Sequence, residues 1–426
     1  GIPAGETSVR ARLGALWRRG QKRMRGLDFT PRAAAEVPPL DLLRIDLCFV
    51  AAVAAVLADP GAAFDAQSRH LLLALRTGEP ARVARAFALE SFLLATGSDS
   101  ARAQMAPMLE SARSLARKYD APALADLCDL VELLAETVAG DPGRALTRAI
   151  PLLRAGVRHA PELPGFHTLA QLCRLHALQR LGRYDQLRHQ LPDLLAAARA
   201  GDDRTALVAL EALATDVAAV YGDPDDARAH AAACAAAWPA FDGREFHLQH
   251  LQILGAEAHA RLAARDPLGA WALVDAATPA LARSSLGRLR PLRIRIAELT
   301  GRVALAALWA GPASASASRS LAAEAPRRAL EQAVETLVRD DDHARAALLR
   351  GGLRQIAGDL SGAAAHFRAA REAFAAAGLL AHAAVAELRL ARVIGGDDGP
   401  SRSALLALGV PRPDLLALLL APAPSD

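Results

Sequence analysis

A short turn motif, repeated along the chain, constrains the fold more than any other feature of the sequence. The motif is Gly followed by Asp or Glu and then Pro, or a close variant, as in Gly78-Glu79-Pro80 and Gly222-Asp223-Pro224. Gly readily adopts the left-handed conformation that ends a helix, Asp caps the next helix, and Pro fits that helix's first turn. The motif predicts a tight corner between two helices. We expect such corners at Gly78, Gly140, Gly182, Gly222, Asp266 and Gly358.

The spacing of these turns predicts a repeat architecture. From Gly140 to Arg265 successive turns start 40–43 residues apart. The segments between them carry apolar stripes at helical spacing, as Tyr184, Leu187 and Leu191 do. We therefore expect an all-α protein, a TPR-like α-solenoid of stacked antiparallel helical hairpins, with repeats longer than the roughly 34 residues of the standard tetratricopeptide repeat. The expected hairpins are residues 64–96, 100–139, 142–181, 184–221, 224–264, 267–310, 324–357 and 361–394.

Composition supports a helical core built from small and aliphatic side chains. Apolar residues make up 52% of the chain, and aromatic residues only 4%. Ala, Leu and Arg dominate, and all three are strong helix formers. Ala-rich faces also allow helices to approach closely, as stacked hairpins require.

The chain divides, on its pattern, into four segments. Residues 1–40 form a basic connecting segment, and residues 41–310 form the helical repeat array. A Pro/Ser/Ala-rich stretch, 311–320, is typical of a flexible linker. Residues 321–426 are expected to form further helical repeats and a Leu-rich cap.

The basic charge is concentrated at the N-terminus. The net charge of the whole chain is +4, whereas residues 1–26 alone carry seven basic side chains and one acidic one. The rest of the chain is therefore slightly acidic, which argues against a nucleic-acid-binding surface. Within the basic segment, residues 9–25 form an amphipathic stretch that either contacts a membrane surface or an acidic partner, or packs on the array as a connecting helix. The longest uncharged apolar run, from Leu47 to Ala58, is too short to be a transmembrane segment.

The residues that commonly carry catalysis do not form a recognisable site. The sequence contains no phosphate-binding loop, no kinase motif and no nucleophile elbow, so we expect no enzymatic activity and no cofactor. A metal site at His247, His250 and Glu257 fails on distance, because Glu257 lies about 10 Å along the helix from His250. Metal ligands must lie about 2 Å from the ion. We expect these side chains, with His259, to form hydrogen bonds between helices instead.

The four cysteines, Cys48, Cys128, Cys173 and Cys234, are too far apart in sequence to form a local metal or redox motif. Each lies in an apolar helical stretch, which is typical of buried thiols in a cytoplasmic protein.

A group of charges near the start of the array is a candidate buried ion pair. Asp46, Arg44, Arg69 and Arg85 all lie within apolar helical runs. A buried charge is costly unless it is paired. We therefore expect Asp46 to pair with one of these arginines, the alternative being that each charge lies on a solvated face.

Three stretches carry a resemblance to a known family: Leu42 to Cys48 with Asp65 to Pro80 and Arg82 to Ala86, Phe246 to His250, and Gly409 to Pro422. Together they resemble the long C-terminal region of bacterial serine/threonine protein kinases of the kind found in myxobacteria and planctomycetes. The resemblance implies a kinase domain upstream of Gly1, and none of that domain's ATP-binding or catalytic residues has a counterpart here.

On this basis we expect a non-catalytic regulatory scaffold that binds a protein or peptide in its concave groove. The alternative is the sensor array of a transcription activator or a signalling ATPase. An enzyme built on an α/α toroid would need paired acids facing a cavity, whereas the run Asp340 to Asp342 is typical of helix capping.

Overall fold

The computed structural model describes residues 26–55, 60–97, 99–159, 165–243, 245–311 and 317–424. Across these residues all regular secondary structure is helical, and no strand is present. The predicted all-α class is therefore confirmed. In this described part of the chain, no helix is both long and apolar enough to cross a membrane.

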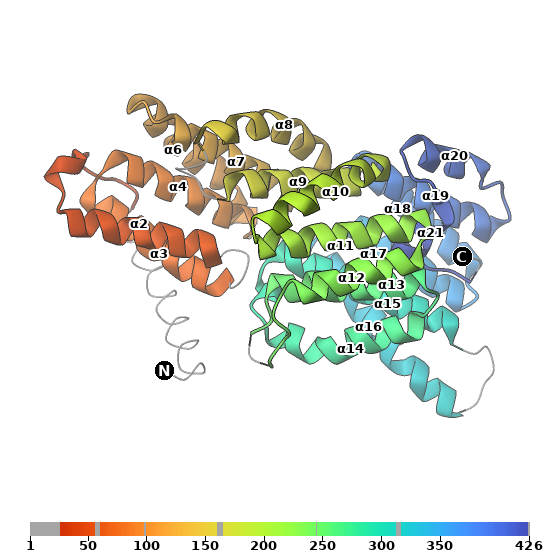
Figure 1. Cartoon of the computed structure of the whole chain (residues 1–426). Helices are drawn as coiled ribbons and strands as arrows, with labels where there is room; N and C mark the ends of the chain where they lie inside the picture. Colours follow the sequence, from red (N-terminus) through yellow and green to blue (C-terminus); the bar gives the residue numbers. More distant parts are fainter. Residues whose placement is uncertain are drawn as a thin grey trace. The chain divides into compact units, whose positions relative to one another are not determined.

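The chain divides into two compact units, whose helices are labelled in Figure 1. The first contains the residues up to 140 together with 147–173, and the second contains 141–146 and everything from 174 onward. The division falls inside the segment 41–310 that the sequence predicts as a single array. A turn motif reports only the local direction of the chain, so it carries no information on which hairpins share a core.

The first unit begins with a short 3-10 turn, Ala34–Glu36, and continues through six α-helices. They are α2 (Pro39–Ala55), α3 (Pro60–Thr77), α4 (Pro80–Ala95), α5 (Asp99–Arg102), α6 (Met105–Lys118) and α7 (Pro122–Ala139). Helix α4 is the centre of this unit, because it packs against α3, α6 and α7 and most of its residues are buried. Helices α8 (Pro142–His159) and α9 (Phe166–Arg180) span the boundary between the units.

The second unit consists mainly of helical hairpins. Its helices are α10 (Tyr184–Ala200), α11 (Arg204–Tyr221), α12 (Pro224–Ala236), α13 (Leu248–Ala263), α14 (Pro267–Arg283), α15 (Arg290–Ala310), α16 (Ala317–Arg339), α17 (His343–Ile356), α18 (Leu360–Ala376), α19 (Leu380–Ile394), α20 (Gly399–Ala407) and α21 (Pro413–Leu420). Helix α11 contacts α13, α13 contacts α15, and α15 contacts α17, so these alternate helices form a continuous row. We call these four helices, together with α19, which also packs against α21, the inner row.

The corners between helices have the conformation that their glycines allow. Gly78, Gly140, Gly182, Gly222 and Gly358 have φ angles between 76° and 85°. At the remaining predicted corner Arg265 itself has a φ of 61°, and the carboxylate of Asp266 accepts a 2.9 Å hydrogen bond from the backbone N–H of Gly269 at the start of α14. In three further corners the residue with positive φ is an aspartate instead of a glycine: Asp120, Asp202 and Asp341. The glycine-based motif missed these, although Asp tolerates this conformation better than most residues.

Two predictions for the C-terminal part need correction. Part of the expected linker, 312–316, lies outside the described residues, but α16 already begins at Ala317, so residues 317–320 are helical. The Leu-rich segment does not cap the end of the array. Helix α21 instead lies against α11, α13, α15 and α19 of the inner row (Figure 1). Seven of its eight residues are buried, as a helix that is apolar on every side requires.

Candidate functional site

The surface that surrounds α21 is the most distinctive feature of the second unit. We call it the inner surface, meaning the faces of the inner row that contact α21 together with the buried charges beside them. It holds α21 by contacts at both ends of the helix and by apolar contacts between them.

The N-terminal end of α21 is held through Asp414. Arg392 of α19 donates a 2.6 Å hydrogen bond to Asp414, and Arg402 of α20 donates two, of 2.8 and 2.7 Å. Burial by itself would raise the pKa of Asp414, but the hydrogen bonds from Arg402 and Arg392 outweigh it and lower the pKa. The carboxylate is therefore charged at neutral pH, and a negative charge in the first turn also stabilises a helix through its dipole.

The C-terminal end of α21 is held through backbone carbonyls. The last carbonyls of a helix lack partners within the helix. Arg389 of α19 donates through Nε to the carbonyl of Ala421 at 2.6 Å, and Arg302 of α15 donates to that of Leu419 at 3.2 Å. Arg389 is only 1% exposed, so its charged group lies in the interior, where it contacts this end of α21.

A cluster of charges lies beside the contact between Arg302 and α21. Glu298 forms 2.9 Å ion pairs with both Arg302 and Arg345, and Arg345 also pairs with Asp342 at 2.5 Å. The side chains of Arg345, Arg302 and Glu298 are 11%, 13% and 15% exposed. Burial by itself would raise the pKa of Glu298, but the surrounding cations, led by Arg302 and Arg345, lower it far below its ordinary value. This cluster links α15 to α17 and, through Arg302, to α21.

The same region contains polar groups that no described residue satisfies. The Nε atoms of Arg180 and Arg302 are buried without a hydrogen-bond partner among the described residues, and so is Nδ1 of His382. Burial, with the nearby Arg345, lowers the pKa of Arg180 to about 10, and the same two factors lower that of His382 to about 3. His382 is therefore neutral at physiological pH, and the charge of this region is carried by arginines and carboxylates.

The histidines that the sequence singled out divide between two roles. His247 donates its backbone N–H to Nδ1 of His250 at 2.9 Å, and Nε2 of His250 contacts the carbonyl of Pro239 at 3.1 Å. These two residues thus organise the start of α13 and the preceding loop, which corrects the expectation of bonds between helices. His259 does form such a bond, to Asp216 of α11 at 2.5 Å. Among the described residues no group of His, Cys, Asp or Glu side chains has the arrangement of a metal site.

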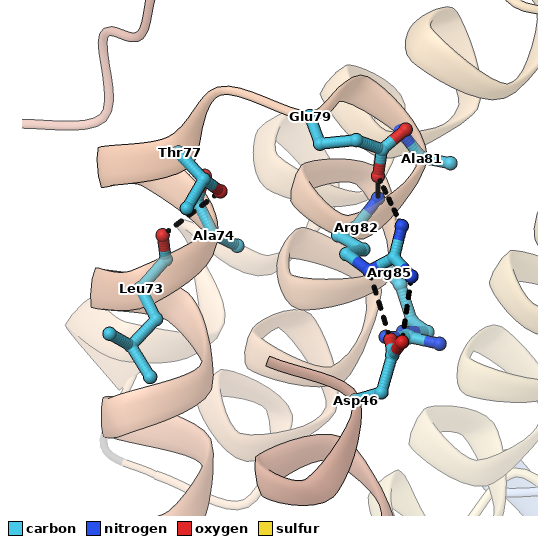
Figure 2. Close-up of polar contacts among 8 residues, drawn as sticks. All are labelled: Asp46, Leu73, Ala74, Thr77, Glu79, Ala81, Arg82 and Arg85. Atoms are coloured by element: carbon cyan, nitrogen blue, oxygen red, sulfur yellow. Dashed lines mark hydrogen bonds and ion pairs between the residues drawn. The ribbon is translucent and has the colours of Figure 1, made fainter. Parts of the chain in front are cut away.

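In the first unit, Asp46 is at the centre of an ion-pair cluster that joins α2 to α4 (Figure 2). Arg82 donates to Asp46 through Nε at 3.0 Å and Nη2 at 2.7 Å, and Arg85 also pairs with it. Arg82 additionally contacts Glu79, whose carboxylate caps the start of α4 (Figure 2). Arg85 lies over the ring of Phe49, 4.2 Å from its centroid, which adds a cation–π contact.

Sequence reasoning identified only part of this cluster. Arg44 pairs with Asp41 at 2.9 Å and Arg69 with Asp65 at 3.0 Å, so neither contacts Asp46. Both arginines pair with a residue three or four positions away on their own helix. Such a local pair loses less conformational entropy than a contact between helices. Arg82 was missed, although it lies one helical turn before Arg85 on the same face. The side chain of Asp46 is 34% exposed, so the pair is only partly buried.

The remaining sequence predictions concern residues that do not belong to either cluster: the stretch 9–25, the cysteines and the run Asp340 to Asp342. The basic amphipathic stretch 9–25 lies outside the described residues. All four cysteines are free thiols, of which Cys128, Cys173 and Cys234 are buried and Cys48 is half-buried. The run Asp340 to Asp342 serves two structural purposes, because Asp340 pairs with Arg293 and Asp342 caps α17.

No family model matches this chain, and no curated protein or solved structure matches it. The contacts described above are therefore the basis for any functional conclusion. Chemically, the inner surface consists of apolar faces and arginine donors that contact α21.

Proposed function

We propose that this chain is a non-catalytic protein-binding region, built as a TPR-like α-solenoid, that acts as a regulatory scaffold. The single observation that carries the proposal is the docking of α21. The inner surface buries an eight-residue helix along its length and supplies arginines to its acidic first turn and to its terminal carbonyls. A surface that recognises peptides in this way needs these properties, because apolar contacts supply affinity and end contacts fix direction.

We take the complete protein to be a serine/threonine kinase, because the sequence resembles the C-terminal regions of such bacterial kinases. On this proposal a kinase domain precedes the array in the complete cytoplasmic protein, and the array recruits or restrains a protein substrate or regulator. The sensor array of a transcription activator or signalling ATPase is the alternative. Nothing in the geometry of the inner surface favours it over the kinase.

The test of this function has two parts. The reading frame upstream of Gly1 should encode a kinase domain, and a nucleotide-binding P-loop domain there would favour the alternative. In the complete kinase, Arg389→Ala should lower phosphorylation of the protein substrate and leave phosphorylation of a short generic peptide unchanged. If both activities respond equally, the array does not act by binding the substrate. The purified chain by itself should neither hydrolyse ATP nor transfer phosphate.

A further inference from the structure

Helix α21 differs from the other helices of the second unit in how it is attached. Helices α11, α13, α15, α17 and α19 each pack tightly against a neighbour in sequence. Helix α21 has few contacts with the preceding α20, and most of its contacts are with helices that lie far from it in the chain. It therefore lies on the inner surface as a bound peptide would.

The contacts define the chemistry that this surface recognises. An acidic side chain in the first turn meets Arg392 and Arg402, and the end of the helix meets Arg302 and Arg389. Between these ends the helix presents buried leucines on every side. A ligand for this surface is thus a short helix, rich in leucine, with an aspartate or glutamate at its start.

We infer that the inner surface binds such a helix from a partner protein, and that α21 occupies the surface until the partner helix displaces it. The inference rests on the proposed binding function and adds the nature of the partner and its regulation. The partner helix and α21 compete for the same arginines, so the chain has two states: one closed by its own C-terminal helix and one occupied in trans.

The experiment uses the full chain and a fluorescein-labelled peptide with the sequence of residues 411–424. Asp414→Asn in the chain weakens docking of its own α21 and leaves every arginine of the surface in place. Asp225→Asn is the matched control, because Asp225 also lies in the first turn of a helix but pairs only locally, with Arg228. The second probe is the same peptide with asparagine at the position of Asp414.

Fluorescence anisotropy should show the aspartate peptide binding the Asp414→Asn chain at least about tenfold more tightly than the wild-type and Asp225→Asn chains. The asparagine peptide should bind the Asp414→Asn chain at least about tenfold more weakly than the aspartate peptide does. Leu418→Ala, which removes an apolar contact of α21 and keeps Asp414, should likewise strengthen binding of the aspartate peptide. It provides the measurement if Asp414→Asn fails to fold.

Equal affinities for all chains, or no binding by any of them, would overturn the inference. So would dimers of the Asp414→Asn chain that the peptide does not dissociate, because the surface would then take a second copy of this chain. If the complete kinase depends on Arg389 for its protein substrate while Asp414→Asn changes nothing, the proposed function stands and the displacement of α21 does not.

Discussion

Arginine supplies nearly all of the positive charge of this chain, since Lys22 and Lys118 are its only lysines. The planar guanidinium group donates in a fixed fork, which suits contacts with a carboxylate or with a helix end. Asp46 in the first unit and Glu298 in the second are each held by two arginines from other helical turns. At the scale of single residues, these ion pairs join helices whose packing the apolar pattern alone does not specify.

The Asp46 cluster predicts a moderate cost for removing one carboxylate. Asp46→Asn should lower the free energy of unfolding by about 1–2 kcal/mol, because it leaves Arg82 and Arg85 without their shared partner. Water screens this third-exposed group, so the cost stays below that of breaking a fully buried pair. Asp41→Asn is the control, since Asp41 and Arg44 are well exposed, and it should change stability by no more than about 0.5 kcal/mol. Denaturant titrations that give the same value for both variants would contradict this account.

The same cluster has a defined pH dependence. Burial by itself would raise the pKa of Asp46, but hydrogen bonds from Arg82 and Arg85 lower it overall. Its stabilising contribution is thus complete above the unfolded-state pKa of about 3.9 and is lost as pH falls through the lower folded-state value. The difference between wild type and Asp46→Asn should persist from neutral pH to about pH 4 and shrink only in stronger acid.

Buried histidines predict a second acid effect, which begins at a higher pH than that of Asp46. Burial lowers the pKa of both His70 and His382 to about 3, whereas an unfolded histidine titrates near 6.5. Because the unfolded state binds these protons first, stability should fall as pH drops below about 6.5 and continue to fall toward 3. Replacing His382 with Gln should recover about 1–3 kcal/mol of the stability that wild type loses between pH 6.5 and 4.5. Parallel pH profiles for the two chains would show that His382 does not titrate in this way.

At the scale of helices and turns, the sequence predicted most of the local structure. Each expected hairpin contains two long helices of the structure, because Gly, Asp and Pro act on the few residues around them. The hairpin 224–264 lacks a short corner between its helices, since α12 ends at Ala236 and α13 begins at Leu248. The position of α21 could not be predicted in the same way. Its sequence shows that it is apolar on every side and must be buried, but the helices that bury it lie far away in the chain. The partner of Asp46 was uncertain for the same reason, since three candidate arginines have similar local surroundings.

Substitutions at two corner glycines distinguish the cost of backbone strain from the cost of steric crowding. Gly182 and Gly358 share a φ of 78°, so alanine at either position incurs a similar conformational cost of about 1–2 kcal/mol. An added Cβ at Gly182 would lie 2.7 Å from Cβ of Ala381, whereas at Gly358 it would meet nothing within 4 Å. Gly182→Ala should therefore destabilise the chain by about 2–4 kcal/mol and Gly358→Ala by only about 1–2 kcal/mol. Equal losses in thermal or chemical unfolding would show that the corner at Gly182 does not lie against Ala381.

At the scale of the whole molecule, α21 connects the fold of the second unit to its proposed function. Burying its five leucines contributes about 11 kcal/mol, and fixing the backbone of its eight residues costs about 12 kcal/mol. The two terms nearly cancel, so the contacts of Asp414, Arg302 and Arg389 decide whether the helix is docked. We therefore expect α21 to open without unfolding of the helices beneath it.

Native-state hydrogen exchange, followed by mass spectrometry on the full chain, tests this central claim most directly. The backbone amides of residues 416–420 should exchange through an opening that costs several kcal/mol less than the opening of α11, α13 and α15. Asp414→Asn should speed exchange in α21 and leave those three helices unchanged. If α21 exchanges only together with the inner row, by global unfolding, it is a fixed part of the core and the inner surface is not a site that a partner helix can enter.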